Sequence, residues 1–273
     1  MSTIKQLIKA KVLQMIEVLP MGRDLYLHFA SSRLGISYRG IYGDYHEADS
    51  AVSQAVAKEY DIINENKSEN AEQEKTTLDD WFHDIDYPLL FWLSRLVGED
   101  TVLLELGGSV GHFFFTSDRY LNYPQKLRWT IAELPHAVKL GRQIVAERDE
   151  QRLSYINSDD LTTAEPANVF MTAGTLQYMN THVAEIITSL SVLPEHVLIH
   201  NLPVHRDKSF WTLQNLGVCE LPYRIYSLSE LNAAMSDLGY KQVATWTNPR
   251  SIEIPFHRGL NIDGYLGFYF QKN

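Results

Sequence analysis

Apolar residues in the last two thirds of the chain fall into short runs that are separated by longer amphipathic stretches. The short runs have the length and composition of buried strands. The stretch at 227–238 begins with a serine cap and stops at Gly239, as a helix does. Because predicted strands alternate with predicted helices, we expect an α/β fold in which a mostly parallel sheet carries helices on both faces. The predicted strands are 101–106, 128–134, 153–157, 168–173, 196–201, 241–247 and 265–271, and the predicted helices are 112–121, 181–192 and 227–238.

The first 95 residues follow a different pattern. Apolar side chains recur at helical spacing over residues 4–19. The aromatic and apolar cluster at 81–92 is too apolar to be left in water. A chain of 273 residues has room for one large domain and an accessory segment. We therefore predict a mostly helical N-terminal cap over residues 1–95. It would lie on the side of an α/β domain, residues 96–273, at which a second ligand enters.

A glycine-rich loop follows the first predicted strand of the α/β domain. The segment ELGGSVG places Glu105 in the strand, and its glycines in a turn that leads into the next helix. Such a turn brings backbone N–H groups and a helix N-terminus close to a ligand. The segment does not match the dinucleotide-binding fingerprint, because two of its glycines are missing. It does not match a P-loop either, because no Gly-Lys-Ser/Thr follows. The spacing acid-x-Gly-x-x-x-Gly instead resembles the loop of class I S-adenosylmethionine methyltransferases, with Ser109 in place of a third glycine.

Acidic residues also stand at the ends of the next two predicted strands. Glu133 comes 22 residues after Gly111, near the distance at which such folds place a carboxylate on ribose hydroxyls. A carboxylate suits this task because it accepts from both hydroxyls at once. Asp159 follows the third strand, where a side chain would accept from the adenine amino group. The predicted cofactor-binding residues are Glu105, Gly107, Gly108, Ser109, Gly111, Glu133, Leu134, Asp159 and Gly174.

From about Tyr38 to its end, the chain resembles a family of bacterial methyltransferases often associated with surface-polysaccharide genes. The matching segments are LELGGSVG, LRWTIAELPHAV, GTLQYM, TLQNLGV with PYRIYS, IPFH and GYLGFYF. The resemblance implies S-adenosyl-L-methionine as the cofactor and a class I methyltransferase (Rossmann-like) fold: a seven-stranded mostly parallel sheet with an antiparallel last strand. The segment AELPHAV is also similar to the second-strand motif of small-molecule O-methyltransferases, which implies that Glu133 binds the ribose. Since activity in the family is assigned largely by fold, the resemblance implies cofactor and architecture more than substrate.

Methyl transfer to a hydroxyl needs a base, and histidine suits this role near neutral pH. His205 follows the fifth predicted strand at the expected acceptor edge and matches the histidine of the family pattern, so we predict it as the base. A histidine that only caps or packs in a loop fits this position equally well. His257, between the last two strands, is the second candidate. His200 lies inside a predicted strand, which favours packing, and the helix start at His112 disfavours a base.

Polar residues near these histidines are candidates for acceptor binding. They would hold sugar hydroxyls or, equally, fasten the insertion at 209–226 to the body of the domain. The segment YRGIYGDY is a candidate lid through Arg39, Tyr42 and Tyr45. The predicted acceptor-binding residues are Tyr178, Gln214, Asn215, Tyr223 and Arg224.

Acidic residues outnumber basic ones by 34 to 24, and the excess is local. Between residues 44 and 86, 13 acidic residues and three lysines account for the whole net charge of −10. Such a surface repels phosphate backbones, so nucleic-acid substrates are disfavoured. The most polar part, residues 64–77, is typical of a solvated helix or a mobile linker, and we expect it to be mobile.

Cysteine content and hydropathy bear on the compartment. Cys219 is the single cysteine, which excludes an internal disulfide. No apolar run reaches the ~18 residues of a membrane span, and charged residues interrupt any secretory signal. We therefore expect a cytoplasmic protein without stable membrane insertion, although the lysines opposite the apolar stripe at 4–19 would also suit a membrane surface.

Two hypotheses from different classes remain. The first is an S-adenosylmethionine-dependent methyltransferase that acts on a hydroxyl, or an amine, of a small molecule or glycan precursor. The second is a catalytically silent cofactor-binding or scaffold protein with the same fold, which Ser109 and the uncertain base leave open. The His and Asp residues at 83–86 and 200–205 lack the spacing of a metal site, so no metal is expected. Whether the chain forms a homodimer is left open.

Overall fold

The computed structural model describes residues 16, 37–52, 78, 82–216 and 219–273. The seven strands predicted between residues 101 and 271 are confirmed, and their ends differ by a few residues. The strands are β1 (Ser37–Tyr42), β2 (Val102–Leu106), β3 (Arg128–Glu133), β4 (Leu153–Asn157), β5 (Val169–Ala173), β6 (His196–His205), β7 (Phe210–Asn215), β8 (Glu220–Ser227), β9 (Tyr240–Asn248) and β10 (Tyr265–Lys272). The helices are α3 (Tyr45–Ser50), α6 (Tyr87–Leu96), α7 (His112–Leu121), α8 (Pro135–Glu147), α9 (Val183–Ser189) and α10 (Leu228–Asp237), and the 3₁₀ turns are η1 (Asp84–Asp86), η2 (Ser158–Thr163), η3 (Leu176–Tyr178) and η4 (Arg258–Leu260).

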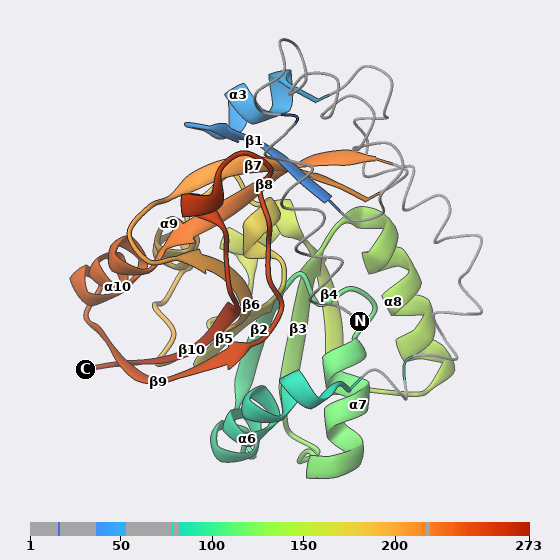
Figure 1. The fold of residues 1–273 in the computed structure, drawn as a ribbon. Helices are drawn as coiled ribbons and strands as arrows, with labels where there is room; N and C mark the ends of the chain where they lie inside the picture. Colours follow the sequence, from blue (N-terminus) through green and yellow to red (C-terminus); the bar gives the residue numbers. More distant parts are fainter. Residues whose placement is uncertain (1–15, 17–36, 53–77, 79–81, 217–218) are drawn as a thin grey trace.

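Seven strands of the sheet lie in the order β4-β3-β2-β5-β6-β10-β9 (Figure 1). The five strands β2 to β6 pair in parallel, and β10 pairs antiparallel with both β6 and β9. A mostly parallel seven-stranded sheet with an antiparallel last strand is the class I methyltransferase fold, so the predicted fold class is confirmed. The parallel pairing also brings the carboxyl ends of β2, β3, β4 and β5 to one edge of the sheet.

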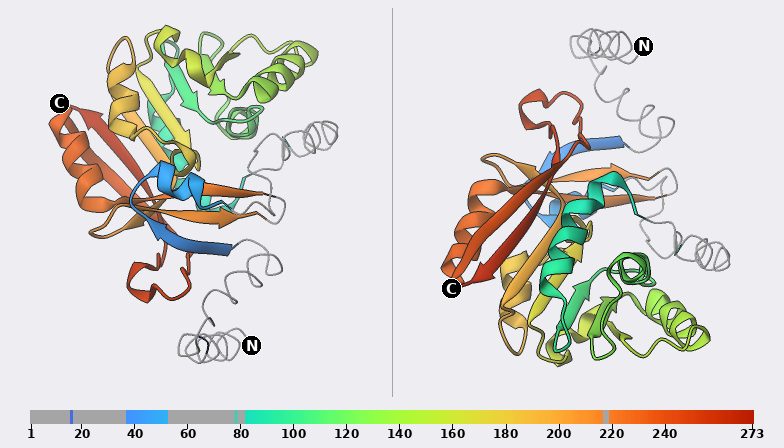
Figure 2. Two further views of the ribbon diagram at one scale, coloured as in Figure 1. Left: turned by 90° about the horizontal axis from the view of Figure 1, so that it is seen from above. Right: turned by 90° about the horizontal axis from the view of Figure 1, so that it is seen from below.

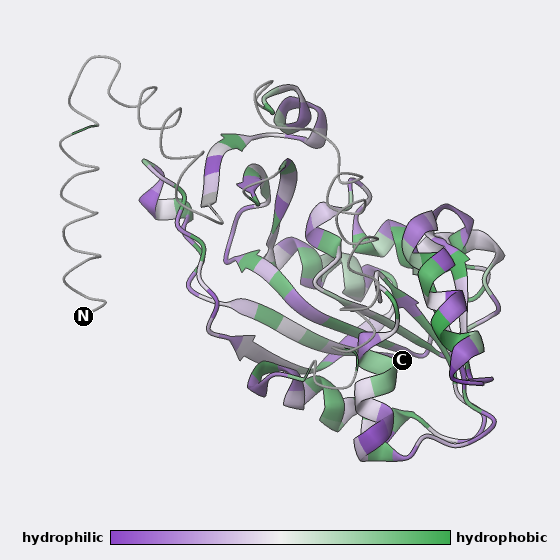
Figure 3. Cartoon of the chain, turned by 90° about the vertical axis from the view of Figure 1, so that its right-hand side faces the viewer, coloured by the Kyte–Doolittle hydropathy of each residue, from purple (hydrophilic) through white to green (hydrophobic). Residues whose placement is uncertain are grey.

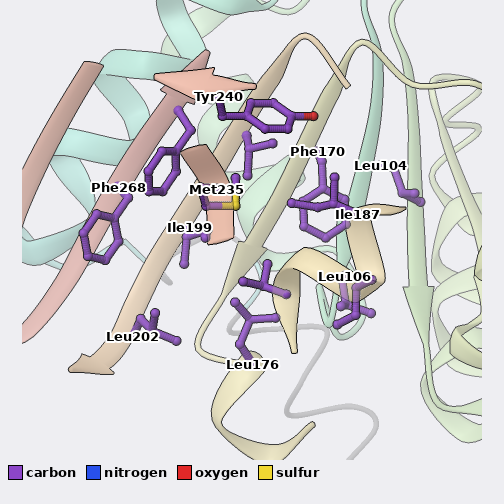
Figure 4. Close-up of a cluster of buried hydrophobic side chains, with 14 of the residues drawn as sticks. Leu104, Leu106, Phe170, Leu176, Ile187, Ile199, Leu202, Met235, Tyr240 and Phe268 are labelled. Carbon is purple, nitrogen blue, oxygen red and sulfur yellow. The ribbon is translucent and has the colours of Figure 1, made fainter. Parts of the chain in front are cut away.

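Helices cover both faces of this sheet. On one face, Leu104 of β2 and Phe170 of β5 belong to the same buried cluster as Ile187 of α9 and Met235 of α10 (Figure 4). On the other face, Leu103 belongs to a second cluster with residues of α6, α7 and α8. Neighbouring residues of β2 therefore point to opposite faces, as the period of a strand requires. The helices carry both hydrophobic and hydrophilic residues (Figure 3), as expected for helices that bury one side.

A further antiparallel group, β1-β7-β8, extends the sheet and was not expected from the sequence. β8 joins β6 through a short parallel pairing in which Val204 faces Tyr226, and β7 lies between β8 and β1. These three strands lie together on one side of the β2–β4 half, with α3 next to them (Figures 1 and 2). The apolar insertion at 209–226 is thus the β7-β8 hairpin, which carries its own buried cluster around Tyr223 and Tyr265.

β1 is a strand inside the segment for which we predicted mostly helix. Its partner in the sheet is β7, with Tyr38 opposite Gln214, so the hydrogen bonds that form this strand come from residues far away in the sequence. α3 and α6 of the same segment are helical, and α6 has a proline in its first turn, where the missing N–H costs nothing.

Much of the predicted cap is not described by the structure. The apolar stripe at 4–19 (apart from Ile16), the polar stretch at 64–77 and Trp81 lie outside the described residues, so the division at residue 95 stays a prediction. None of the described helices combines the length and the apolar composition that crossing a membrane requires.

Candidate cofactor and acceptor site

A cavity of about 410 Å³ opens at the carboxyl edge of the sheet. Its volume lies within the range of small-molecule sites. The wall on the sheet side comes from residues at the ends of β2, β3, β4 and β5, and the opposite wall comes from α3, η3 and β8. The main residues of the sheet side are Gly107, Ser109, Glu133, Leu134, Ser158 and Gly174, and those of the opposite side are Tyr45, Asp49, Tyr178, Met179, Leu221 and Pro222.

The glycine loop is shaped by close backbone packing. Gly107 has a φ of +80°, and a Cβ atom there would overlap the side chain of Thr175, whose hydroxyl donates to the Gly107 carbonyl. At Gly108 an added Cβ would lie 2.5 Å from the Glu105 carboxyl carbon. Ser109 replaces the third glycine of the motif and adopts a φ of +52°. Serine at this position therefore adopts a left-handed backbone conformation that glycine takes without steric cost.

Glu133 links the glycine loop to the end of β3. Its Oε2 accepts from the Ser109 N–H at 3.0 Å, and its Oε1 accepts from the Leu134 N–H at 2.7 Å. The side chain is half-buried and lines the cavity. Because each carboxylate oxygen has a further lone pair, both remain able to accept from a ligand. This is the position at which the sequence predicts a ribose-binding carboxylate.

Glu105 lies beneath the loop and is not among the lining residues. It is 1% exposed, and its Oε2 accepts from the Trp129 indole N–H at 2.8 Å, while its Oε1 has no hydrogen-bond partner. Burial raises the pKa of this carboxyl to about 8, against the effect of the Trp129 hydrogen bond, and the nearby Glu133 carboxylate adds to the rise. In the structure Glu105 supports the loop from below, and a direct contact with a cofactor stays a prediction.

The remaining strand ends complete the sheet side of the cavity. Ser158, the first residue after β4, lines the cavity, whereas Asp159 is exposed and does not. After β5, Gly174 has a φ of +71° and its carbonyl accepts from the Gln177 amide at 2.6 Å. The adenine contact at Asp159 stays a prediction that its exposed position does not favour, and its neighbour Ser158 is the residue of this strand end that lines the cavity.

The opposite wall includes an aromatic and acidic pair from α3. Tyr45 and Asp49 are four residues apart and both line the cavity. The Tyr45 ring packs edge-on against Trp211 of β7 at 5.3 Å between centroids. Burial, and then the nearby Asp49 carboxylate, raise the pKa of Tyr45, so its hydroxyl keeps its proton. Of the three candidate lid residues, Tyr45 lines the cavity and Arg39 and Tyr42 do not, so the lid stays a prediction.

A chain of hydrogen bonds runs from the cavity into the accessory strands. The Tyr178 hydroxyl donates to Gln214 Oε1 at 2.8 Å, and the Gln214 amide donates to the Tyr38 hydroxyl at 2.9 Å. Tyr38 is 3.2 Å from the Tyr265 hydroxyl, which is 2.8 Å from that of Tyr223. Of these residues only Tyr178 lines the cavity. The structure thus brings one predicted acceptor residue to the site and uses Gln214 and Tyr223 to hold it.

The other two predicted acceptor residues, Asn215 and Arg224, lie in β7 and β8 and do not line the cavity. Asn215 is 2% exposed. The Arg224 guanidinium stacks over the rings of Trp211 and Tyr226, at 5.7 and 4.7 Å. This packing agrees with the alternative that the polar residues of the insertion fasten it to the domain.

The predicted bases do not reach the cavity. His205 Nδ1 accepts from the backbone N–H groups of Asp207 and Lys208, both at 3.1 Å, and Nε2 lies 3.2 Å from the Gly259 carbonyl. Its ring therefore connects the turn after β6 to the loop before β10, and neither His205 nor His257 lines the cavity. A catalytic role for either histidine stays a prediction that this placement does not favour.

His200 packs in the sheet, as its place in a strand indicates. Its Nε2 lies 2.9 Å from the Asp86 carboxylate and its Nδ1 accepts from the Trp246 indole at 2.9 Å. Both His200 and Asp86 are buried, so this contact joins η1 to the central sheet. No group of three or more His, Cys, Asp or Glu residues suited to a metal ion occurs among the described residues.

Several lining residues were missed by the sequence reasoning. Asp49 and Pro222 lie in elements that reach the cavity only through the unexpected β1-β7-β8 pairing. His136, the second residue of α8, lies two residues beyond the predicted Leu134. Ser158 belongs to the segment 158–160, at which the sequence predicts the adenine contact, and stands directly before the residue chosen for it, Asp159.

Neither protein-family models nor curated protein sequences give a match to this chain. Among solved structures, a SAM-dependent methyltransferase from Aquifex aeolicus is similar, with a TM-score of 0.48 and 12% identity over 77% of this chain and 98% of that one. The 1,6-didemethyltoxoflavin-N1-methyltransferase of Burkholderia thailandensis has a TM-score of 0.47 and 16% identity, over 81% of this chain and 93% of that one. The mitomycin 7-O-methyltransferase MmcR has a TM-score of 0.43 and 15% identity, over 69% of this chain and 54% of that one. At these values the likenesses carry no argument about function, and the fold assignment rests on strand order and direction.

Proposed function

We propose that this chain is an S-adenosylmethionine-dependent methyltransferase that acts on a hydroxyl or amino group of a small-molecule acceptor. One observation carries the proposal: a single cavity joins the glycine loop and the Glu133 carboxylate at the sheet edge to a polar wall on α3 and η3. The sheet side suits the cofactor, and the opposite side leaves a polar surface for an acceptor.

The residues of the sheet side fit the proposed cofactor. Gly107 and Ser109 of the loop line the cavity, and the missing side chain of Gly107 leaves the space that Thr175 fills behind the loop. The Glu133 oxygens keep lone pairs for two ribose hydroxyls. Beyond Glu133, the apolar Leu134 and Ala137 adjoin the polar Ser158, a combination that suits an aromatic base with a polar edge.

The chemistry of methyl transfer asks for positioning above all. Bound S-adenosylmethionine supplies a methyl group on a positively charged sulfur, which an oxygen or nitrogen attacks in line. The chain holds its loop in place through the contact between Ser109 and Glu133. On the other side, Tyr178 is oriented by its hydrogen bond to Gln214, and Leu221 forms an apolar part of the wall. Such orientation supplies a large part of the rate enhancement of a two-substrate reaction.

The finer expectations from the sequence stay predictions. O-methylation of a glycan precursor and a link to surface polysaccharides rest on the resemblance, and the cytoplasmic location rests on hydropathy and cysteine content. Whether the chain forms a homodimer stays open. A catalytically silent S-adenosylmethionine-binding protein is the second candidate function, favoured by the placement of His205 and His257 away from the cavity. Methyl transfer to any acceptor by the purified chain would decide between the two functions.

Glu133→Ala tests the proposed cofactor site. We expect the affinity for S-adenosylhomocysteine to fall about 5- to 150-fold, the effect of losing hydrogen bonds to a charged group. Isothermal titration calorimetry measures this change. Glu99→Ala is a matched control, because Glu99 is exposed before β2, at the opposite edge of the sheet. Equal affinities in the two variants would show that Glu133 does not bind the ribose.

A further inference from the structure

Hydrogen bonds stabilise both ends of α3, the helix that forms part of the cavity wall opposite the sheet. Asp44 caps the first turn by accepting from the Glu47 N–H at 2.8 Å. At the other end, Arg39 Nη2 donates to the Ala51 carbonyl at 3.0 Å. The same guanidinium makes two bonds of 2.6 Å to the buried carboxylate of Glu220. Since the first turn of α3 is capped and its C-terminal end is bonded to Arg39 of β1, Asp49 has a defined place in the cavity wall.

The cavity is lined by acidic side chains on both of its sides. Among the described residues that line it, the acidic ones are Asp49 and Glu133, His136 is the one histidine, and neither lysine nor arginine is present. The two carboxylates come from opposite sides, Glu133 from the end of β3 and Asp49 from α3. A positive or neutral polar group is therefore favoured between them, and a phosphate or carboxylate is opposed by both.

We propose that Asp49 binds the hydroxyl or amino group that receives the methyl group, and that the part of the acceptor inside the cavity carries neither phosphate nor carboxylate. This proposal rests on the proposed methyltransferase function. As the acceptor oxygen or nitrogen bonds to the methyl carbon, the carbon–sulfur bond breaks and its electron pair stays on sulfur. The acceptor proton passes to the Asp49 carboxylate and from there to water. A sugar nucleotide would then enter the cavity only by its sugar end.

The first test needs no acceptor, because S-adenosylmethionine carries a positive charge on sulfur that S-adenosylhomocysteine lacks. We expect the wild-type chain to bind S-adenosylmethionine more tightly, and Asp49→Asn to lower the ratio of the two affinities about threefold or more. Asp49→Glu, which keeps the charge, retains the ratio. Glu47→Gln is the matched control on the same helix, at an exposed position outside the cavity.

The outcomes of this titration separate the two proposals. An unchanged ratio in Asp49→Asn, with S-adenosylhomocysteine still bound as in the wild type, would overturn the role of Asp49. Failure of the wild-type chain to bind either compound would instead contradict the proposed function. Binding of S-adenosylhomocysteine by the variant also shows that the variant is folded.

The second test addresses the acceptor class with matched compounds. Transfer of a labelled methyl group is measured to glucosamine and to glucosamine 6-phosphate, and to tyramine and to tyrosine. We expect label only in the member of each pair that lacks the phosphate or carboxylate, and at least tenfold less of it with Asp49→Asn. Equal or faster labelling of a phosphate- or carboxylate-bearing member would overturn the proposal.

Discussion

The free energy of unfolding of the wild-type chain is expected to fall by about 4 kcal/mol between pH 4.5 and pH 8, because Glu105 is buried. In the variant Glu105→Gln this fall should be absent. Burial raises the pKa of this carboxyl to about 8, whereas the unfolded chain releases the same proton near pH 4.5. Between these values the folded chain binds more protons than the unfolded chain. The free energy of unfolding therefore decreases as the pH rises through this window, and above it the loss is complete.

Urea unfolding at several pH values measures this effect. The glutamine keeps an oxygen for the Trp129 indole N–H and does not ionise, so the difference between the two proteins should grow from pH 4.5 to pH 8. Glu99→Gln, at an exposed position, should follow the wild-type curve. Parallel curves for wild type and Glu105→Gln would mean that Glu105 is ionised in the folded chain at neutral pH.

Arg39→Met is expected to lower the free energy of unfolding by about 3 to 5 kcal/mol. The two bonds of 2.6 Å between the guanidinium and Glu220 would be lost, and Glu220, which is 1% exposed, would be left as a buried charge without its cation. The methionine fills the space of the side chain without replacing the charge. Urea or thermal unfolding of the variant at pH 7 measures the loss.

The double variant Arg39→Met/Glu220→Leu separates the cost of an uncompensated charge from the value of the ion pair. The electrostatic attraction within a buried ion pair offsets little more than the free-energy cost of taking its two charges out of water. The double variant should therefore recover most of the stability lost in Arg39→Met. A double variant as unstable as the single one would show that packing of the arginine side chain, and not its charge, holds β1 on β8.

The strands and the cofactor edge were predictable because their signals are local. An apolar run such as 101–106, followed by glycines, specifies a buried strand and a sharp turn within a dozen residues. Glu133 was identified by its distance from Gly111 and lies in the cavity wall. Ser109 adopts a left-handed backbone conformation that is uncommon for serine, and the sequence alone does not reveal it.

The acceptor side was less predictable because long-range pairing creates it. β1 and β7 are more than 160 residues apart in the sequence and pair with Tyr38 opposite Gln214. No local pattern in SYRGIY predicts this pairing. Asp49 reaches the cavity only as a consequence of that pairing. His205 has the residue type and the chain position of a base, yet its ring nitrogens bond to the backbone of neighbouring turns. Residue type and strand order do not determine such contacts.

Titration of the intact chain with S-adenosylhomocysteine by calorimetry tests the central claim most directly, because it asks whether the cavity at the carboxyl edge of the sheet binds this cofactor. We expect saturable binding at one site per chain, with an affinity that Glu133→Ala weakens and Glu99→Ala leaves unchanged. The absence of any binding at millimolar S-adenosylhomocysteine, with the chain shown to be folded, would contradict the account.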